Sequence, residues 1–152
     1  MIPVYVIHLP NPERKAKIAA ELARVGFDDV TYVAAAEPVQ GFTMSNMRRN
    51  PRGEFGCAMS HVKAIMRAIY DDRDGALFIE DDIEFVGDGV KRFAAPFDRL
   101  TYIDLCYLGG HPREPVIESE FPGLVKAGKW SCAEAYYMRR YVTEKFLDFW
   151  CD

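Results

Sequence analysis

Three consecutive acidic residues, Glu80, Asp81 and Asp82, follow the short apolar run 76–79. The run predicts a buried strand, and open α/β sheets bind ligands beyond the carboxyl ends of their strands. Adjacent carboxylates repel one another unless a cation or a ligand rich in donors balances them. Mg²⁺ and Mn²⁺ prefer carboxylate oxygens and complete their shell with substrate phosphates. The triplet therefore favours a metal site that holds a diphosphate; a solvated acidic turn is the alternative.

A second polar group, Ser60, His61 and Lys63, lies near the start of a helix predicted over residues 55–69. Helix N-termini favour phosphate through free N–H groups and a partial positive charge, and Lys63 adds a cation. Helix capping and a surface histidine are the alternative. The apolar stripe of this helix is expected to consist of Phe55, Met59, Val62, Met66 and Ile69.

Two further charged residues, Arg14 and Asp104, are candidates with a weaker pattern. Arg14 follows the first predicted strand, just inside a helix, where a guanidinium suits phosphate; an exposed helix arginine is the alternative. Asp104 falls within the predicted strand 102–108, where an unpaired carboxylate would be costly. It is therefore interpreted as paired, as a cap or as a general base. The pair 109–110, two glycines, indicates either a close approach to a ligand or a turn.

The elements that must position these residues alternate between strands and helices, which predicts an α/β layered domain. The opening unit consists of a strand over 4–9, a helix capped by Asn11 and ended by Gly26, and a parallel strand over 30–34. Residues 36–53 have no period and predict a loop. The later predicted elements are a turn at 71–75, a helix near 88–97, strands over 76–79, 102–108 and 133–138, a hairpin of 116–117 with 124–125, and a helix over 142–150.

The composition is that of one globular domain, with 152 residues, of which 49% are hydrophobic and 28% charged. The net charge of −4 argues against a nucleic acid or an anionic membrane surface as the main partner, and no apolar run is long enough to span a bilayer. The first apolar run lacks a basic region and is interrupted by His8 and Pro10, so it predicts a strand rather than a signal peptide. Four separated cysteines then indicate reduced thiols in a cytoplasmic protein and leave carboxylates as the expected metal ligands.

Four segments, in order along the chain, resemble the glycosyltransferase family 25 domain, which includes lipooligosaccharide and procollagen galactosyltransferases. Residues 4–14 resemble its opening strand with a downstream arginine, and 53–61 are similar to its E-x-G-C-x-x-S-H signature. Residues 77–83 are similar to its acidic metal motif, and 133–140 to a late strand that leads into a helix. The signature and the acidic motif, about twenty residues apart, carry the specific part of the resemblance.

The resemblance implies a GT-A-like, Rossmann-type, mostly parallel sheet flanked by helices, in a single domain over residues 1–152. It implies metal-dependent transfer of a hexose, with galactose expected, from a UDP-sugar to a glycan or other hydroxyl acceptor, with inversion, in lipopolysaccharide biosynthesis. Asp82 becomes the expected ligand of Mn²⁺ or Mg²⁺, with Glu80 as its partner, and Asp81 the contact to the donor ribose or sugar. The expected lining of the nucleotide-diphosphate pocket is Arg14, Ser60, His61 and Lys63. No motif fixes the base that an inverting transfer needs; Asp104 and Glu134 are the candidates.

Family members usually continue well past the late strand and helix, whereas this chain stops at Asp152. Three alternatives stay open: a minimal enzyme, an enzyme that completes its site as a homo-oligomer, and a catalytically degenerate protein that binds a nucleotide sugar or a partner. A metal-dependent phosphohydrolase that uses the same acidic triplet is a further alternative. Residues 41–53 are interpreted as a lid over the donor.

Overall fold

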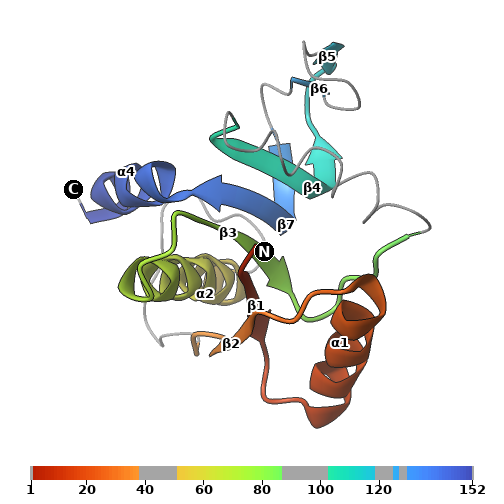
Figure 1. The fold of residues 1–152 in the computed structure, drawn as a ribbon. Coiled ribbons are helices and arrows are strands. Elements are labelled where there is room, and N and C mark those ends of the chain that lie inside the picture. Colours follow the sequence, from red (N-terminus) through yellow and green to blue (C-terminus); the bar gives the residue numbers. More distant parts are fainter. Residues whose placement is uncertain (1, 38–50, 87–102, 119–124, 127–129, 152) are drawn as a thin grey trace.

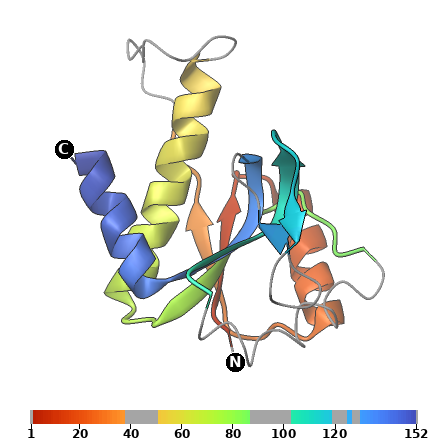
Figure 2. The ribbon, with the colours of Figure 1, turned by 90° about the horizontal axis from the view of Figure 1, so that it is seen from above.

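A five-stranded sheet lies at the centre of the molecule, with helix α1 on one face and helices α2 and α4 on the other (Figure 1, Figure 2). The computed structural model describes residues 2–37, 51–86, 103–118, 125–126 and 130–151. These residues form one α/β domain of three layers, which confirms the fold class that the alternating pattern predicts.

The opening β-α-β unit has the predicted form. It consists of β1 (Val4–His8), α1 (Pro12–Val25) and β2 (Val30–Ala34). The side chain of Asn11 caps α1, because its oxygen accepts N–H groups of the first helical turn. Gly26 ends the helix in the left-handed conformation, at φ 86°, which is easily accessible to glycine. β1 and β2 pair in parallel.

The strands lie in the order β2-β1-β3-β7-β4. The three later strands of this sheet are β3 (Gly75–Glu80), β4 (Leu105–Pro112) and β7 (Trp130–Arg139). β1 is parallel to β2 and β3, whereas β7 is antiparallel to its neighbours β3 and β4. Four strands therefore share one direction and β7 opposes them, so the sheet is mixed and, as expected, most of its strands are parallel to one another.

Helix α2 (Pro51–Tyr70) begins earlier than predicted, so the loop prediction for 36–53 is wrong at residues 51–53. The buried face of the helix is shifted relative to the predicted stripe, with which it shares Val62. Its buried side chains belong to Ser60, His61, Val62, Ala64, Ile65 and Ala68. Met66, which the stripe prediction places inside, is 56% exposed.

The reason for this shift is the size of the side chains that α2 packs against. The sheet presents aromatic rings from Tyr5, Phe78 and Tyr136 to this helix, and the three rings stack in a row. Two alanines of α2, Ala64 and Ala68, meet this surface. Close packing therefore favours a small-residue face over a larger apolar one.

The C-terminal half contains several elements that differ in extent from their predictions. Gly109 and Gly110 lie inside β4, at shifts in its register with β7, so the predicted turn after that strand is wrong. Helix α4 spans Arg140–Cys151. The predicted hairpin strands are confirmed as an antiparallel pair, one residue later in sequence, formed by β5 (Ile117–Glu118) and β6 (Val125–Lys126).

The core has two halves, one on each face of the sheet. Along β1, Val4 and Val6 face α1, whereas Tyr5 and Ile7 face α2 and α4, as the two-residue period of a strand requires. Two predicted elements lie outside the described residues: the helix near 88–97 and most of the lid over 41–53. Within the described ranges, no helix combines the length and the apolar character needed to cross a bilayer.

Candidate functional site

One edge of the sheet gathers the strand ends at which a ligand is expected. β1, β2 and β3 are parallel, so their carboxyl ends lie at the same edge. The opposed strand β7 reaches this edge with its earlier residues. Its pairing with β3 ends where Ile79 lies opposite Ala135, and Glu80 and Glu134 come next on the two strands.

The acidic triplet at this edge is divided among three surroundings. Glu80 is the last residue of β3 and is partly buried. The side chain of Asp81 is only 3% exposed, whereas that of Asp82 is 57% exposed. The three carboxylates therefore have different partners, which the sequence pattern alone does not distinguish.

Asp81 connects the ends of β1 and β3 to the first turn of α1. Its Oδ2 accepts the backbone N–H of Leu9 at 3.0 Å. Its Oδ1 lies 2.5 Å from the guanidinium of Arg14. A buried carboxylate needs such partners, because an unpaired buried charge is costly. A donor ribose or sugar that contacts Asp81 would have to share this carboxylate with Leu9 and Arg14.

Arg14 supplies a positive charge to this edge. Its backbone N–H donates to Oδ1 of Asn11 at 3.1 Å, which fixes the helical turn that carries the side chain. The guanidinium bridges Asp81 and Asp82, the latter at 2.7 Å, and the Arg14 side chain is 31% exposed. Its Nε is buried and has no hydrogen-bond partner within the described residues. Arg14 is therefore a paired arginine with a donor still available, rather than an exposed helix arginine.

Glu80 lies against helix α2, where His61 and Tyr136 extend a hydrogen-bonded row into the core. His61 Nε2 lies 3.3 Å from Oε1 of Glu80, and His61 Nδ1 lies 3.0 Å from the hydroxyl of Tyr136. The hydrogen bond from His61 is the main reason that the pKa of Glu80 lies below its usual value, although burial opposes the shift. An ionised Glu80 only accepts, so Nε2 carries the hydrogen in this arrangement and Nδ1 accepts the Tyr136 hydroxyl. Burial raises the pKa of Tyr136, which keeps that hydroxyl protonated.

The other two residues predicted on α2 have backbone partners. Ser60 is buried; its Oγ donates to the carbonyl of Gly56 at 2.6 Å and accepts the N–H of Ala36 at 2.8 Å. Its hydroxyl hydrogen is therefore already in use. Lys63 is exposed and donates from Nζ to the carbonyl of Ala34 at 2.6 Å. Because α2 begins at Pro51, neither Ser60 nor Lys63 lies in its first two turns. His61 is buried, so the alternative of a surface histidine is wrong.

Among the described residues, the hollows at this edge include an α2 hollow and a β7 hollow. The first, the α2 hollow, lies between the strand ends and α2. Its volume is about 310 Å³, within the range of small-molecule sites. Its lining includes residues of α1, of α2 and of the chain at and just after the end of β3, among them Arg14, Gly53, His61, Glu80, Asp81 and Asp82. Ser60 also lines it, whereas Lys63 is not among the described residues that do.

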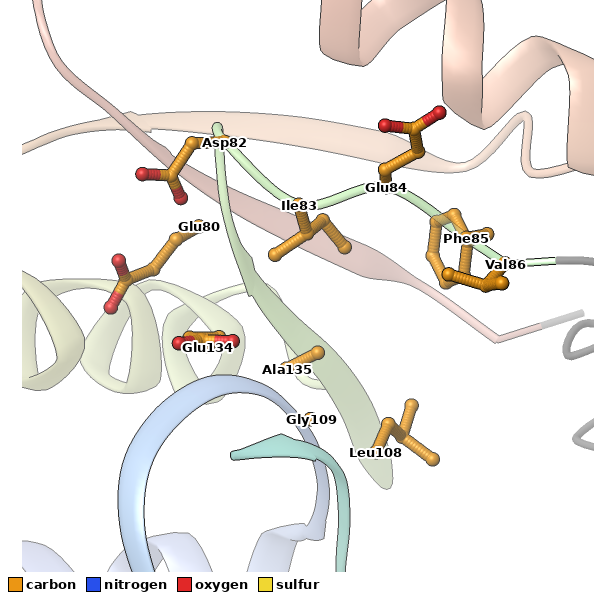
Figure 3. Close-up of a pocket in the computed structure, with 10 residues that line it drawn as sticks. All are labelled: Glu80, Asp82, Ile83, Glu84, Phe85, Val86, Leu108, Gly109, Glu134 and Ala135. Atoms are coloured by element: carbon orange, nitrogen blue, oxygen red, sulfur yellow. The ribbon is translucent and has the colours of Figure 1, made fainter. Parts of the chain in front are cut away.

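The second hollow, the β7 hollow, lies between the segment after β3 and strands β4 and β7 (Figure 3). Its volume is about 570 Å³. Figure 3 shows the carboxylates of Glu80 and Asp82 on the same side of the strand end, with Glu134 below them. A Cβ placed on Gly109 would lie 3.7 Å from Oε2 of Glu134, so this glycine leaves room beside that carboxylate.

Asp104 lies outside this group. It precedes β4, and its side chain is 53% exposed. The hydroxyl of Tyr141 donates to it at 3.2 Å, and the guanidinium of Arg139 lies 3.7 Å away. The backbone carbonyl of Asp104 accepts the N–H of Arg139, which lies opposite Gly75. Asp104 is therefore five strand residues from the level of Glu80, roughly 16 Å at 3.3 Å per residue. The prediction that Asp104 lies within a strand is wrong, because β4 begins at the next residue. Its carboxylate is partly exposed to solvent and is paired with Tyr141 and Arg139.

The sequence interpretation missed the part that Cys57 plays at this edge. Its Sγ lies 3.8 Å from Oε1 of Glu80 and adjoins the His61 ring. The spacing of Cys57 and His61, four residues apart in a helix, could have indicated that both side chains share a face. The hollow beside β7 could not be found this way, because it depends on how β3, β4 and β7 pair.

In a comparison with known families, residues 1–108 match the family model described as "Glycosyltransferase family 25 (LPS biosynthesis protein)". The matched range contains the signature, the acidic triplet and Arg14; Glu134 lies beyond it. No curated protein matches the chain.

Proposed function

The chain belongs to glycosyltransferase family 25, and on that premise we propose that it transfers a hexose from a UDP-sugar to a hydroxyl group of a glycan or similar acceptor. We propose galactose as the sugar, inversion at the anomeric carbon, and a role in lipopolysaccharide assembly. One observation supports this most: Glu80 and Asp82 line both hollows. A donor whose diphosphate lies at this shared wall would have its nucleotide on one side and its sugar on the other.

The α2 hollow is the side that suits the nucleotide and the diphosphate. Arg14 lines it with a buried Nε that has no partner among the described residues, and a guanidinium N–H is a strong donor to phosphate. Gly53, in the first turn of α2, also lines it. The helix N-terminus favours an anion there, so the phosphate argument made for Ser60 applies instead to the backbone near Gly53.

The carboxylates of Glu80 and Asp82 fit a hard divalent cation. Both offer oxygen ligands, and they face the same side of the strand end (Figure 3). Mg²⁺ and Mn²⁺ bind through one or two carboxylates together with substrate phosphates. When bound, such an ion would neutralise the charge that develops on the departing diphosphate.

Glu134 is the base that we propose for the acceptor hydroxyl. It lines the β7 hollow with Glu80 and Asp82, on the strand next to β3. In the proposed step the acceptor oxygen attacks the anomeric carbon, the bond from that carbon to the UDP oxygen breaks, and the proton goes to Glu134. Proton transfer of this kind typically contributes 10²- to 10⁴-fold in rate.

Calorimetric titration of the protein with UDP, with and without Mn²⁺, tests the proposal. The wild type should bind UDP more tightly with Mn²⁺, and Asp82→Ala should lose that difference. Asp28→Ala is the matched control, because Asp28 is exposed and lies just before β2, at the opposite edge of the sheet. It should bind as the wild type does.

A second assay follows the fate of the donor. Release of UDP from a UDP-hexose, even by slow hydrolysis, supports a transferase. Binding without release would favour a nucleotide-sugar-binding protein, and release of inorganic phosphate from simple phosphoesters would favour a phosphohydrolase. Failure of the wild type to bind UDP with Mn²⁺ would refute the donor site.

A further inference from the structure

Three side chains of different chemistry meet at the wall of the α2 hollow. Cys57 and His61 lie one turn apart on α2, and Glu80 ends β3. Their ligand atoms, Sγ, a ring nitrogen and a carboxylate oxygen, all lie within 4.8 Å of one another. This cluster shares Glu80 with the carboxylate pair of Glu80 and Asp82, and it differs from that pair by a thiol and an imidazole.

The distances within the cluster match those of a small tetrahedral site. With bonds of about 2.0 Å from zinc to nitrogen and oxygen and about 2.3 Å to sulfur, a tetrahedron separates N and O by about 3.3 Å and S and O by about 3.5 Å. Here His61 Nε2 lies 3.3 Å from Oε1 of Glu80, and Cys57 Sγ lies 3.8 Å from the same oxygen. One ion could therefore contact all three groups with only small side-chain adjustments.

The surroundings of His61 also suit a ligand. Its Nδ1 lies 3.0 Å from the hydroxyl of Tyr136, which can donate or accept. Without an ion, Nε2 carries the hydrogen, so an ion would bind the other tautomer, in which Nδ1 donates to Tyr136 and the lone pair of Nε2 faces Glu80 and Cys57. Metal-binding histidines are usually oriented by such a hydrogen bond from the second ring nitrogen.

We propose that Cys57, His61 and Glu80 form a binding site for Zn²⁺ or a similar thiolate-binding divalent ion. A thiolate and a carboxylate balance the charge of the ion, and a thiolate selects Zn²⁺ over Mg²⁺ and Mn²⁺. All three residues line the α2 hollow, so a fourth position faces its interior, as in zinc sites that hold three protein ligands and an exchangeable one. The site goes beyond the proposed transferase function and stands without it.

Cobalt titration of the reduced, chelator-treated full chain tests the site directly, because Co²⁺ occupies zinc sites and reports thiolate ligation. The wild type should develop a near-ultraviolet thiolate-to-cobalt band that saturates at one equivalent. Zn²⁺ should remove the band, and a large excess of Mn²⁺ should not. Cys57→Ser should abolish it, whereas Cys106→Ala, which removes a buried thiol from the α1 face of the core, should keep it.

Two further variants separate ligation from folding. Tyr136→Phe should weaken Zn²⁺ binding by roughly 10-fold or more, since loss of an outer partner typically costs 10- to 100-fold. Glu80→Gln should weaken it at least as much. Absence of the thiolate band in the folded wild type, or its persistence in Cys57→Ser, would overturn the proposal. UDP binding is not part of either readout, so failure here leaves the donor site unaffected.

Discussion

Replacing Arg14 by glutamine should destabilise the protein by about 2–3 kcal/mol, because it leaves the carboxylate of Asp81 buried without its cation. Removing one partner of a buried ion pair typically costs about 3–5 kcal/mol. Asp81 is 3% exposed, but the Arg14 side chain is 31% exposed, so water reaches part of the pair and lowers the cost. The bond to Asp82 adds little, because that side chain is 57% exposed and exposed pairs contribute about 0–1 kcal/mol.

The assay is urea unfolding at neutral pH, supported by thermal melts. A loss of about 2–3 kcal/mol in a chain of this size lowers Tm by roughly 4–12 °C. Arg67→Gln is the matched control, since Arg67 is 54% exposed and pairs with Asp71 within one helical turn. It should cost clearly less than Arg14→Gln, because solvent screens an exposed pair.

A double-mutant cycle separates the ion pair from the packing of the arginine. Asp81→Asn keeps an oxygen for the N–H of Leu9 and removes the buried charge. With that charge gone, Arg14→Gln should cost much less than it does in the wild type, with a coupling of about 1–2 kcal/mol, in the range found for contacting residues. A cost below 1 kcal/mol for Arg14→Gln, or additive effects in the double variant, would refute the reasoning.

Three other substitutions test separate parts of the structure. Hydrogen bonds, chiefly from Arg24, lower the pKa of Glu21 from 4.5 to about 2. The contribution of Glu21 to stability is therefore present above pH 4.5 and is lost as the pH falls towards 2. Glu21→Gln should make the unfolding free energy fall less steeply between these two pH values. Gly75→Ala should cost about 1–3 kcal/mol in urea unfolding, because the new Cβ would lie 2.9 Å from Cζ of the Tyr137 ring. Glu134→Gln should lower the rate of UDP release in the presence of acceptor by about 10²- to 10⁴-fold and leave UDP affinity unchanged.

Each of these has a control or a contrary outcome in the same chain. Equal acid slopes for the wild type and Glu21→Gln would contradict the pKa argument. Gly109→Ala is the control for Gly75→Ala. Among the described residues, its new Cβ would meet no atom closer than 3.7 Å, so this substitution should change stability little. Asp104→Asn should leave turnover unchanged. If Asp104→Asn instead abolished turnover while Glu134→Gln stayed active, Asp104 would replace Glu134 as the proposed base.

The opening unit could be predicted from sequence because its signals are local. The Asn11 cap, the Gly26 terminator and the apolar run of β1 each act within a few residues. The face that α2 buries could not be predicted in this way. It depends on the rings that the sheet presents, and these lie on strands that are distant in sequence.

In the candidate site, too, local sequence signals predict some features and long-range contacts decide the others. A strand end rich in carboxylates marks the acidic triplet, but the partners that bury Asp81 are Leu9 and Arg14, which lie far earlier in the sequence. No sequence motif marks Glu134 as the base, because its place beside Glu80 follows from the antiparallel insertion of β7 between β3 and β4. Long-range strand order thus decides which acids converge.

The charge around the β7 hollow bears on the proposed metal dependence. Among the described residues that line it, four are acidic, Glu80, Asp82, Glu84 and Glu134, and none is basic. Figure 3 shows the Glu84 carboxylate pointing away from the other three. A diphosphate beside the remaining three would be repelled, and Arg14 already shares its charge between two aspartates. If the donor binds at the shared wall, a cation must accompany it, so UDP affinity should depend on Mn²⁺ or Mg²⁺ far more strongly than that of a site built from arginines and lysines.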